Sequence, residues 1–300
     1  MKVTADTPAQ VRDLPLRART EYLLRRFGVH ARKSLGQNFL TNEGAAKRLA
    51  EAACAPGEAL VEIGGGLGAL TVPLAASGLP LKVVEIDPSL ARVLVWLTAD
   101  LSNVEVLVGD FLKLPPEALW PRPAVAVGNL PYLSAGAILQ HAWALDSPYS
   151  LIVATVQREV ADRLRTGPGT KAYGPLSVLA AVHTRDIAVV AQMSPESFEP
   201  IPGVESTALS FVRNEALPPA LEDPDSLNLA IRGAFGGRRK TLLNSLKMSL
   251  HWDKPTAEEV LREAHLDGKR RGETLELAEL LTLANAIHHR VERAGGDLTR

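Results

Sequence analysis

The amino-acid sequence predicts an α/β protein with a mostly parallel sheet of seven strands, followed by a small α-helical domain over residues 215–300. Short apolar runs alternate with helical stretches between residues 59 and 165, a pattern typical of βαβ units in a parallel sheet covered on both faces. Two further apolar runs follow without a long helix between them. The composition then changes at residues 214–224, which contain three prolines, and leucines and alanines recur at helical spacing beyond them.

The first thirty residues are expected to form an N-terminal extension, residues 1–30. Residues 1–19 show no clear periodicity and predict weak order. Thr20 can cap a short helix over residues 21–27, which Gly28 would end in the left-handed conformation.

The α/β domain, residues 31–214, begins with a polar loop over 33–40 and a helix over 42–53. Its expected parallel strands are short runs rich in Val, Ile and Leu, at residues 59–63, 81–85, 104–107, 124–127 and 151–156. The helical stretches lie near residues 69–77, 89–99, 134–145 and 157–165. Two last runs, 185–193 and 207–212, are expected to pair antiparallel at one edge of the sheet.

The composition is that of a soluble protein in a reducing cytosol. Hydrophobic residues make up 46% of the chain, the mean hydropathy is +0.03, and no apolar run reaches the roughly 20 residues that a membrane helix needs. The first 30 residues carry acids and no apolar segment of the secretory type. The single Cys54 excludes an internal disulfide and a cysteine-rich zinc site. We therefore expect a cytoplasmic protein without a membrane anchor.

The charge is balanced overall but clustered locally. The net charge of −1 argues against a protein that coats nucleic acid indiscriminately. Residues 1–36 nevertheless hold eight Lys and Arg against three acids, and residues 236–254 hold five against one. Such runs usually form solvated surfaces, yet two of them flanking one α/β domain suit a polyanionic partner.

A glycine-rich turn follows the first strand and leads into a helix. Read at Gly64, Gly66 and Ala69, it fits the dinucleotide pattern G-x-G-x-x-A. Glu85, at the end of the next strand, lies 85 − 64 = 21 residues later, where an acid binds a nucleoside ribose. The pattern predicts a nucleoside-containing ligand but does not separate NAD from S-adenosylmethionine.

The next strand ends favour the methyl donor. Asp110, after the third strand, can accept a hydrogen bond from an adenine amino group, and Phe111 can pack on the ring. A dehydrogenase needs an acid or base near the nicotinamide, and no His or Lys stands at these strand ends. The sequence therefore favours S-adenosylmethionine, and it shows no metal-ligand cluster among these motifs.

The fourth strand ends in Gly128-Asn129-Leu130-Pro131-Tyr132. The Asn129 side chain and the Leu130 carbonyl offer two acceptors, Pro131 stiffens the turn, and Tyr132 offers a ring on which a base can stack. Two acceptors beside an aromatic ring suit an exocyclic amine. The alternative is a proline turn with a capping Asn and a packing Tyr.

The motifs resemble those of the 16S rRNA adenine dimethyltransferases, in order and over roughly residues 20–285. The matching segments are Leu35–Leu40, the glycine turn, Glu85, Asp110, Asn129–Tyr132, Gln157–Val160, Lys171–Gly174, Phe198-x-Pro200-x-Pro202 and Phe235-x-x-Arg238-Arg239-Lys240-Thr241 with Asn244. The resemblance implies a Rossmann-like class I methyltransferase domain and a helical domain that binds rRNA. It also implies dimethylation of N6 on two adjacent adenosines near the 3′ end of 16S rRNA in the immature small subunit, by a monomer.

The resemblance also implies roles for individual residues. S-adenosylmethionine would be bound by Gln37, Asn38, Leu40, Gly64, Gly66, Glu85, Asp110 and Asn129. The target base would be received by Asn129, Leu130, Pro131 and Tyr132, with Phe198 closing over it. The RNA would be contacted by Arg158, Arg238, Arg239 and Lys240.

The chain departs from the family pattern at three positions. Gly65 replaces a common Pro, which should loosen the glycine turn, Gly203 replaces a common Lys, and Leu133 replaces a polar or aromatic residue. Two other functions remain open: a non-enzymatic checkpoint factor of small-subunit assembly, and a 23S rRNA adenine methyltransferase of the macrolide-resistance type. Residues 35–40 and 238–244 favour the 16S enzyme.

Overall fold

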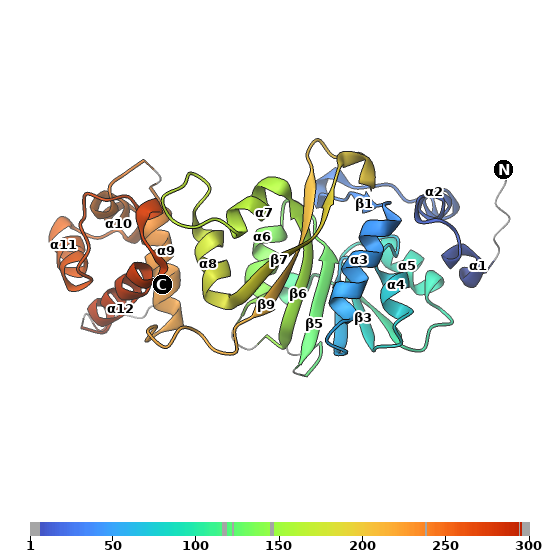
Figure 1. Ribbon diagram of the computed structural model, residues 1–300, viewed down its shortest axis with the longest axis horizontal. Coiled ribbons are helices and arrows are strands. Elements are labelled where there is room, and N and C mark those ends of the chain that lie inside the picture. Colours follow the sequence, from blue (N-terminus) through green and yellow to red (C-terminus); the bar gives the residue numbers. More distant parts are fainter. Residues whose placement is uncertain are drawn as a thin grey trace. The chain divides into compact units, whose positions relative to one another are not determined.

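The computed structural model describes residues 7–115, 119–121, 123–144, 147–237, 239–293 and 295. The chain divides into two compact units (Figure 1). The first contains residues up to Ala161 together with Arg185–Arg213, and the second contains Asp162–Thr184 together with residues from Asn214 onward. The division after Arg213 lies one residue from the expected domain boundary, whereas Asp162–Thr184 belongs to the second unit.

The first unit is built on a seven-stranded, mostly parallel sheet, which confirms the predicted fold class. The strands are β2 (Ala59–Ile63), β3 (Leu81–Glu85), β4 (Val104–Val108), β5 (Ala124–Asn129), β6 (Tyr149–Gln157), β7 (Thr184–Met193) and β9 (Ser206–Arg213). Their order is β4-β3-β2-β5-β6-β9-β7, and β9 runs antiparallel to β6. The chain moves outward from β2 to β4 and returns on the other side of β2, so the strand order reverses between β2 and β5. Open α/β sheets bind ligands at the carboxyl ends of strands at such a point.

Five helices accompany these strands, and side chains cap two of them. They are α3 (Glu43–Cys54), α4 (Thr71–Ala75), α5 (Pro88–Leu97), α6 (Ala135–Ala142) and α7 (Arg158–Leu164). Asn42 accepts the amide of Ala45 at the start of α3, and Asp87 accepts that of Ser89 at the start of α5. Helix α3 packs on β5 and β6, and α5 packs on β3 and β4.

A two-stranded ribbon not expected from the sequence borders the sheet. Strand β1 (Phe39–Leu40) pairs antiparallel with β8 (Phe198–Glu199), with Leu40 opposite Phe198. Two-residue strands leave no alternation to detect, which is why the pattern of the sequence indicated only a loop here.

The N-terminal extension is more ordered than predicted. It forms α1 (Pro8–Arg12) and α2 (Leu16–Phe27), so the helix expected at residue 21 begins five residues earlier. The Thr20 hydroxyl does not cap this helix; it donates to the carbonyl of Leu16. Val11 and Leu23 are fully buried in a cluster with residues of α5. Tertiary packing therefore orders residues whose local periodicity is weak.

The second unit is helical. It contains α8 (Pro175–His183), α9 (Pro224–Phe235), α10 (Leu242–Leu250), α11 (Lys254–Glu263) and α12 (Leu277–Arg293). Helix α8, which the sequence analysis did not predict, packs on α9 and α12, and this contact places Asp162–Thr184 in the second unit. Helix α9 also packs on α10, and the recurring leucines and alanines form the core.

Candidate functional site

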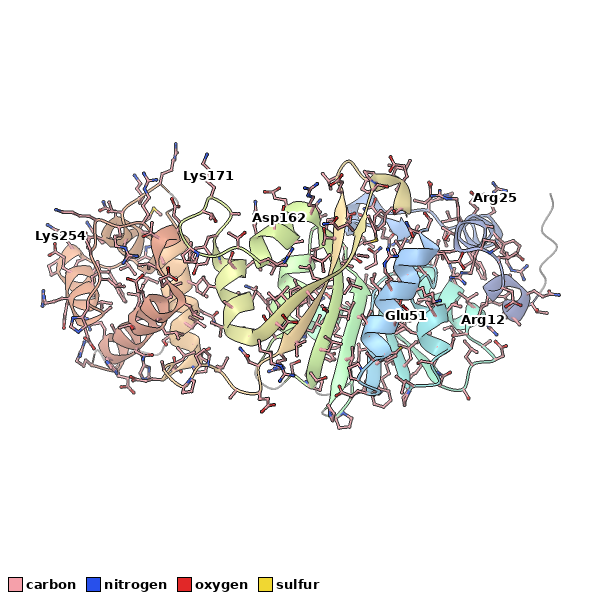
Figure 2. The ribbon with its side chains drawn as sticks, in the orientation of Figure 1. Arg12, Arg25, Glu51, Asp162, Lys171 and Lys254 are labelled. Carbon is pink, nitrogen blue, oxygen red and sulfur yellow. The ribbon has the colours of Figure 1, made fainter. Side chains whose placement is uncertain are left out.

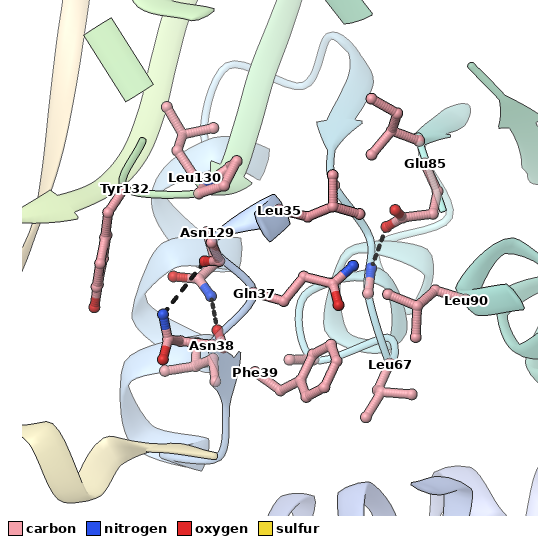
Figure 3. Close-up of a pocket in the computed structure, with 17 residues that line it drawn as sticks. Leu35, Gln37, Asn38, Phe39, Leu67, Glu85, Leu90, Asn129, Leu130 and Tyr132 are labelled. Carbon is pink, nitrogen blue, oxygen red and sulfur yellow. Dashed lines mark hydrogen bonds between the residues drawn. The ribbon is translucent and has the colours of Figure 1, made fainter. Parts of the chain in front are cut away.

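A pocket lies at the carboxyl ends of β2, β3 and β5, where the strand order reverses (Figure 3). It encloses about 680 Å³ of empty space, part of which is open to solvent. Its lining comes from residues 35–40, from the glycine turn after β2, from the end of β3, and from residues 129–132. Four motifs that the sequence analysis singled out separately, residues 35–40, the glycine turn, Glu85 and residues 129–132, thus meet at one site.

The glycine turn after β2 needs its glycines for different reasons. Gly64, Gly66 and Gly68 have φ values of +75°, +56° and +79°, in the left-handed region that favours glycine. Gly65 is constrained by packing instead, because a β-carbon there would lie 2.4 Å from Cγ1 of Val83 and 2.9 Å from Cδ1 of Leu94. The expectation that Gly65 loosens the turn finds no support in this tight packing.

Glu85 is buried at the end of β3, with 3% of its surface exposed. One carboxylate oxygen accepts the amide of Gly66 and the other accepts that of Asp87, both at 2.9 Å. Burial raises the pKa of Glu85 above its ordinary value, although these two hydrogen bonds oppose the shift. Each oxygen keeps a further lone pair, so the carboxylate can hold the glycine turn and still accept from ligand hydroxyls.

Residues 35–40 are tied to the start of α5 through Gln37. Its Oε1 accepts the amide of Arg32 at 2.8 Å, and its Nε2 donates to Oδ2 of Asp87 at 3.4 Å. Arg32 also pairs with Asp87 at 3.2 Å. Gln37, Asn38 and Leu40 all line the pocket, and the polar atoms of Gln37 hold the loop in place.

Asn129, at the end of β5, lies between the loop and the turn that follows. Its Nδ2 donates to the Asn38 carbonyl at 2.8 Å (Figure 3). Only the NH₂ group can make this contact, so the carbonyl fixes which way the carboxamide faces. Its Oδ1 is buried and accepts no hydrogen bond from the described residues. A buried acceptor without a partner is costly, and such atoms in a pocket point to a ligand.

The three residues after Asn129 form one side of the pocket. The Leu130 amide donates to the Thr155 carbonyl at 3.3 Å, and the Pro131 carbonyl accepts from Ser134 at 3.1 Å. The Tyr132 hydroxyl shares a 2.7 Å hydrogen bond with Ser206, and burial raises its pKa. Leu133, beyond the turn, is 78% exposed. The tyrosine ring is therefore held at its far end, as a stacking surface should be.

Two predicted site residues lie elsewhere in the structure. Asp110 accepts the amide of Leu112 and caps the 3₁₀ turn Phe111–Lys113, and it is not among the described residues that line the pocket. Phe198 is fully buried opposite Leu40 and is also absent from the lining. Their contacts with a donor and a base remain predictions.

The sequence analysis missed several apolar lining residues. Phe39, Leu67 and Leu90 line the pocket and belong to the same cluster as Val11 and Leu23 of the N-terminal helices. Gly36 also lines it, with φ +64° and a β-carbon position 3.5 Å from Cβ of Pro131. The sequence analysis also missed Asp87, which holds Gln37 and Arg32, although an Asp followed by Pro is a typical start of a helix. No local pattern marks the apolar lining residues.

The predicted RNA contacts are distributed over both units. Arg158, in the first unit, is exposed and pairs with Glu205. Arg239 and Lys240, in the second unit, are exposed, and Arg238 lies outside the described residues. Within the described part of the chain, no cluster of His, Cys, Asp and Glu could hold a metal ion, and no helix could cross a membrane.

Comparisons with known proteins point to one family. Residues 28–283 match the family model described as ribosomal RNA adenine dimethylase. The chain is 36% identical to the ribosomal RNA small subunit methyltransferase A of Clostridioides difficile, over 91% of this chain and 96% of that one. It is 38% identical to the protein of the same name from Moorella thermoacetica, over 90% and 97%.

Solved structures share the fold. A dimethyladenosine transferase from Plasmodium falciparum superposes with a TM-score of 0.69 at 22% identity, covering 84% of this chain and 98% of that chain. The 23S rRNA methyltransferase ErmE gives a TM-score of 0.58 at 24% identity, covering 84% and 100%.

Proposed function

Because the chain belongs to the ribosomal RNA adenine dimethylase family, we propose that it methylates two adjacent adenosines at N6 in the 3′-terminal hairpin loop of 16S rRNA. The methyl donor is S-adenosylmethionine, and the substrate is the immature small ribosomal subunit in the cytoplasm, bound by a monomer. The observation that carries the proposal is the buried, unpartnered Oδ1 of Asn129. The names of the relatives favour the small subunit over 23S rRNA.

The lining of the pocket fits S-adenosylmethionine in its chemistry. Glu85 provides a carboxylate for ribose hydroxyls, and the glycine turn lets the backbone approach the ligand. Ile86 and Leu90 give apolar walls suited to a planar base. When bound, the donor supplies an electrophilic methyl group.

Asn129 acts by positioning the amine that receives the methyl group. The lone pair of the adenine N6 nitrogen is delocalised into the ring, so the amine is a weak nucleophile. An N–H···Oδ1 hydrogen bond to Asn129 favours a pyramidal nitrogen, and the Leu130 carbonyl provides a second acceptor. Because Oδ1 is shielded in the structure, the residues around it must move aside as the base enters.

The pocket needs no strong general base. Among the described residues that line it, only Glu85 and Tyr132 titrate, and burial raises the pKa of both. A methylated N6 cation is acidic and loses its proton to water after transfer. An unpaired loop adenosine leaves its stack at less cost than a base in a duplex, and the Tyr132 ring can receive it.

The test is single-turnover methylation of unmethylated small subunits at saturating donor. Asn129→Ala removes the acceptor, and the rate should fall by on the order of 10²–10³, as for other preorganised transition-state hydrogen bonds. Asn285→Ala is the matched control: Asn285 lies on α12, where its side chain bonds Ala220 and Glu222, and its rate should equal that of the parent.

The same assay distinguishes the alternatives. A parent rate in Asn129→Ala would show that Asn129 does not hold the amine. A pure checkpoint factor would transfer no methyl group in the parent protein. An enzyme of the macrolide-resistance type would methylate naked 23S rRNA in preference to small subunits.

A further inference from the structure

The second unit contains a cavity of its own, with about 860 Å³ of empty space, part of it open to solvent. It lies between the segment that leads into α8, the end of α9, and the 3₁₀ turn η5 (Gly272–Thr274). None of its lining residues lines the pocket at the carboxyl ends of β2, β3 and β5, which is called the donor pocket from here on. The methyl-transfer chemistry therefore leaves this cavity unexplained.

Aromatic rings and bare backbone form its walls. Tyr173 and Phe235 line it with their rings edge to face, 5.7 Å between centroids. Burial raises the pKa of Tyr173 to about 12, so the ring is neutral at physiological pH. Gly272 lies so close to α9 that a β-carbon would come 2.2 Å from the Ala234 carbonyl. Flat apolar walls suit a planar heterocycle.

The polar lining offers both an acceptor and a donor. Glu273 and Arg163 line the cavity, and the Glu273 backbone is fixed by a 2.8 Å hydrogen bond from the Gly169 amide. The Glu273 side chain is 31% exposed and only loosely paired with Arg271, at 3.8 Å. A carboxylate accepts from the N1–H and N2–H groups of guanine, and an arginine donates to its O6 and N7. Adenine has no N1–H to donate to a carboxylate.

The rim of the cavity is basic. Lys171 is exposed and points outward from the segment before α8 (Figure 2), and Arg239 and Lys240 are exposed next to the lining residue Gly237. The Lys240 side chain lies against Gly237, 3.0 Å from the position of a β-carbon there. Cations at the mouth of an aromatic cavity suit the phosphates that flank a base.

We propose that this cavity captures an unpaired guanosine of the RNA substrate, as an anchoring site separate from the methyl-transfer pocket. The proposal rests on the proposed function for the identity of the RNA. Capture of one extruded base would select a loop or bulge of defined sequence, which phosphate contacts alone do not do.

The direct test is a titration of the full chain with guanosine 5′-monophosphate, followed by methyl NMR of protein labelled at alanine. Ala172 and Ala234 line the cavity and report on its occupancy. Both signals should shift with GMP, and less with IMP, which lacks the N2 amine, or with AMP. Equal shifts with AMP and GMP, or none with GMP, would overturn the proposal.

Glu273→Gln removes the carboxylate while keeping the size of the side chain, and it should abolish the preference for GMP over AMP. Glu258→Gln, at an exposed acid on α11, is the matched control and should keep it. In filter binding to unmethylated small subunits, Glu273→Gln should weaken affinity about tenfold, as for loss of one bidentate base contact. An unchanged nucleotide preference in Glu273→Gln would refute the role of the carboxylate. Because the titration involves no methyl transfer, its outcome is independent of whether the parent methylates 16S rRNA.

Discussion

At the scale of single residues, the pocket is built from polar groups that make hydrogen bonds within the fold and keep further capacity to accept hydrogen bonds. Asn129 uses Nδ2 to hold the Asn38 carbonyl and leaves Oδ1 without a partner. Glu85 holds the glycine turn and the start of α5 with two backbone hydrogen bonds and keeps further lone pairs. Such groups are held in position before a ligand arrives, so binding costs less ordering.

A neighbouring carboxyl group, Glu62, is expected to make stability depend on pH. Glu62 is 1% exposed and accepts from the Thr71 hydroxyl at 2.6 Å, and burial raises its pKa to about 8. The folded protein therefore keeps a proton that the unfolded chain releases near its ordinary pKa of 4.5. Stability should fall as pH rises from about 4.5 to about 8.

Glu62→Gln removes this dependence, because glutamine does not titrate. The free energy of unfolding of the variant minus that of the parent should therefore be larger at pH 8 than at pH 5, as measured by urea unfolding at both pH values. Glu105→Gln, at an exposed acid on β4, is the control, and its free energy of unfolding should change with pH as that of the parent does. If the difference between Glu62→Gln and the parent stays constant with pH, Glu62 does not titrate in this range.

At the scale of elements, the N-terminal helices α1 and α2 contact the residues that hold the donor pocket in place. Arg12 donates to the Leu97 carbonyl and to both oxygens of Asp100 at 2.6 Å. Arg19, only 5% exposed, reaches the Gly68 carbonyl of the glycine turn at 3.4 Å, and burial lowers its pKa to about 10. Both helices lie before residue 28, where the match to the family model begins.

Leu23 tests this support. It is fully buried in the cluster that contains the lining residues Phe39, Leu67 and Leu90. Leu23→Ala should lower stability by about 2–5 kcal/mol and also weaken donor binding, measured by calorimetry below the unfolding transition. Leu246→Ala, at an equally buried position on α10, should lower stability and leave donor affinity unchanged. Equal donor affinity in both variants would limit the N-terminal helices to a role in stability.

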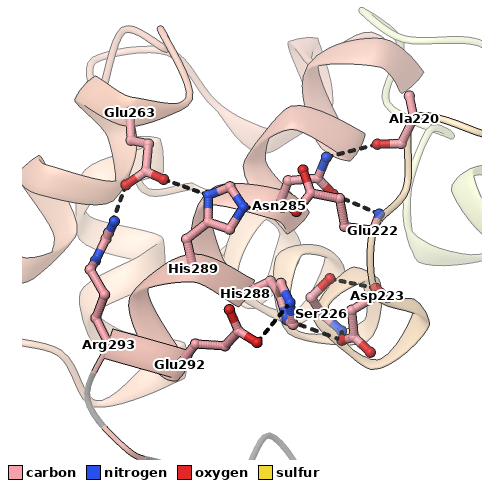
Figure 4. A network of polar contacts seen from close by, with 10 residues as sticks. All are labelled: Ala220, Glu222, Asp223, Ser226, Glu263, Asn285, His288, His289, Glu292 and Arg293. Carbon is pink, nitrogen blue, oxygen red and sulfur yellow. Dashed lines mark hydrogen bonds and ion pairs between the residues drawn. The ribbon is translucent and has the colours of Figure 1, made fainter.

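The second unit contains a titrating base, His289, whose effect on stability also depends on pH (Figure 4). On α12, His289 lies 2.7 Å from both Glu222 and Glu263, and Glu263 also pairs with Arg293. The neighbouring His288 contacts Asp223 at 3.9 Å and Glu292 at 3.5 Å. The two carboxylates raise the pKa of His289, so the protonated imidazole stabilises the folded protein.

This contribution is fully present below pH 6.5 and is lost as pH rises through the folded-state pKa of His289. His289→Gln should therefore be less stable than the parent at pH 6 and equal to it at pH 9. Because the ring is 41% exposed, the difference should not exceed about 1 kcal/mol. Thermal unfolding at both pH values measures it, and a deficit that persists at pH 9 would mean that His289 acts through packing.

Sequence patterns predicted the parallel strands, the glycine turn and the Asn129–Tyr132 turn because their information is local. Five apolar runs with glycine or polar ends suffice to predict a sheet and the edge that binds ligands. The β1–β8 ribbon and helix α1 depend on contacts between distant residues, so short windows could not show them. Asp110 has the residue type expected of a ligand contact, and the structure shows in addition that it caps a 3₁₀ turn, which the strand pattern did not indicate.

At the scale of the whole molecule, a net charge of −1 coexists with local basic surfaces. Arg239 and Lys240 lie exposed in the second unit, next to the cavity. RNA affinity should therefore depend on a few cations, with each phosphate contact contributing roughly 0.7–0.9 to the slope of log K against log salt.

Arg239→Ala with Lys240→Ala should lower that slope by up to about 2, measured by filter binding to unmethylated small subunits at several salt concentrations. Lys254→Ala removes an exposed cation of the same unit that pairs with Glu258, and the slope should stay that of the parent. An unchanged slope in the double variant would identify residues 239–240 as an ordinary solvated surface.

The packing around Gly65 limits which residues this position can accept. A β-carbon there would lie within 3 Å of Cγ1 of Val83 and of Cδ1 of Leu94, so any other residue requires these side chains to move. A substitution at Gly65 is therefore coupled energetically to the residues at 83 and 94, and it becomes easier to accommodate once either of them is smaller.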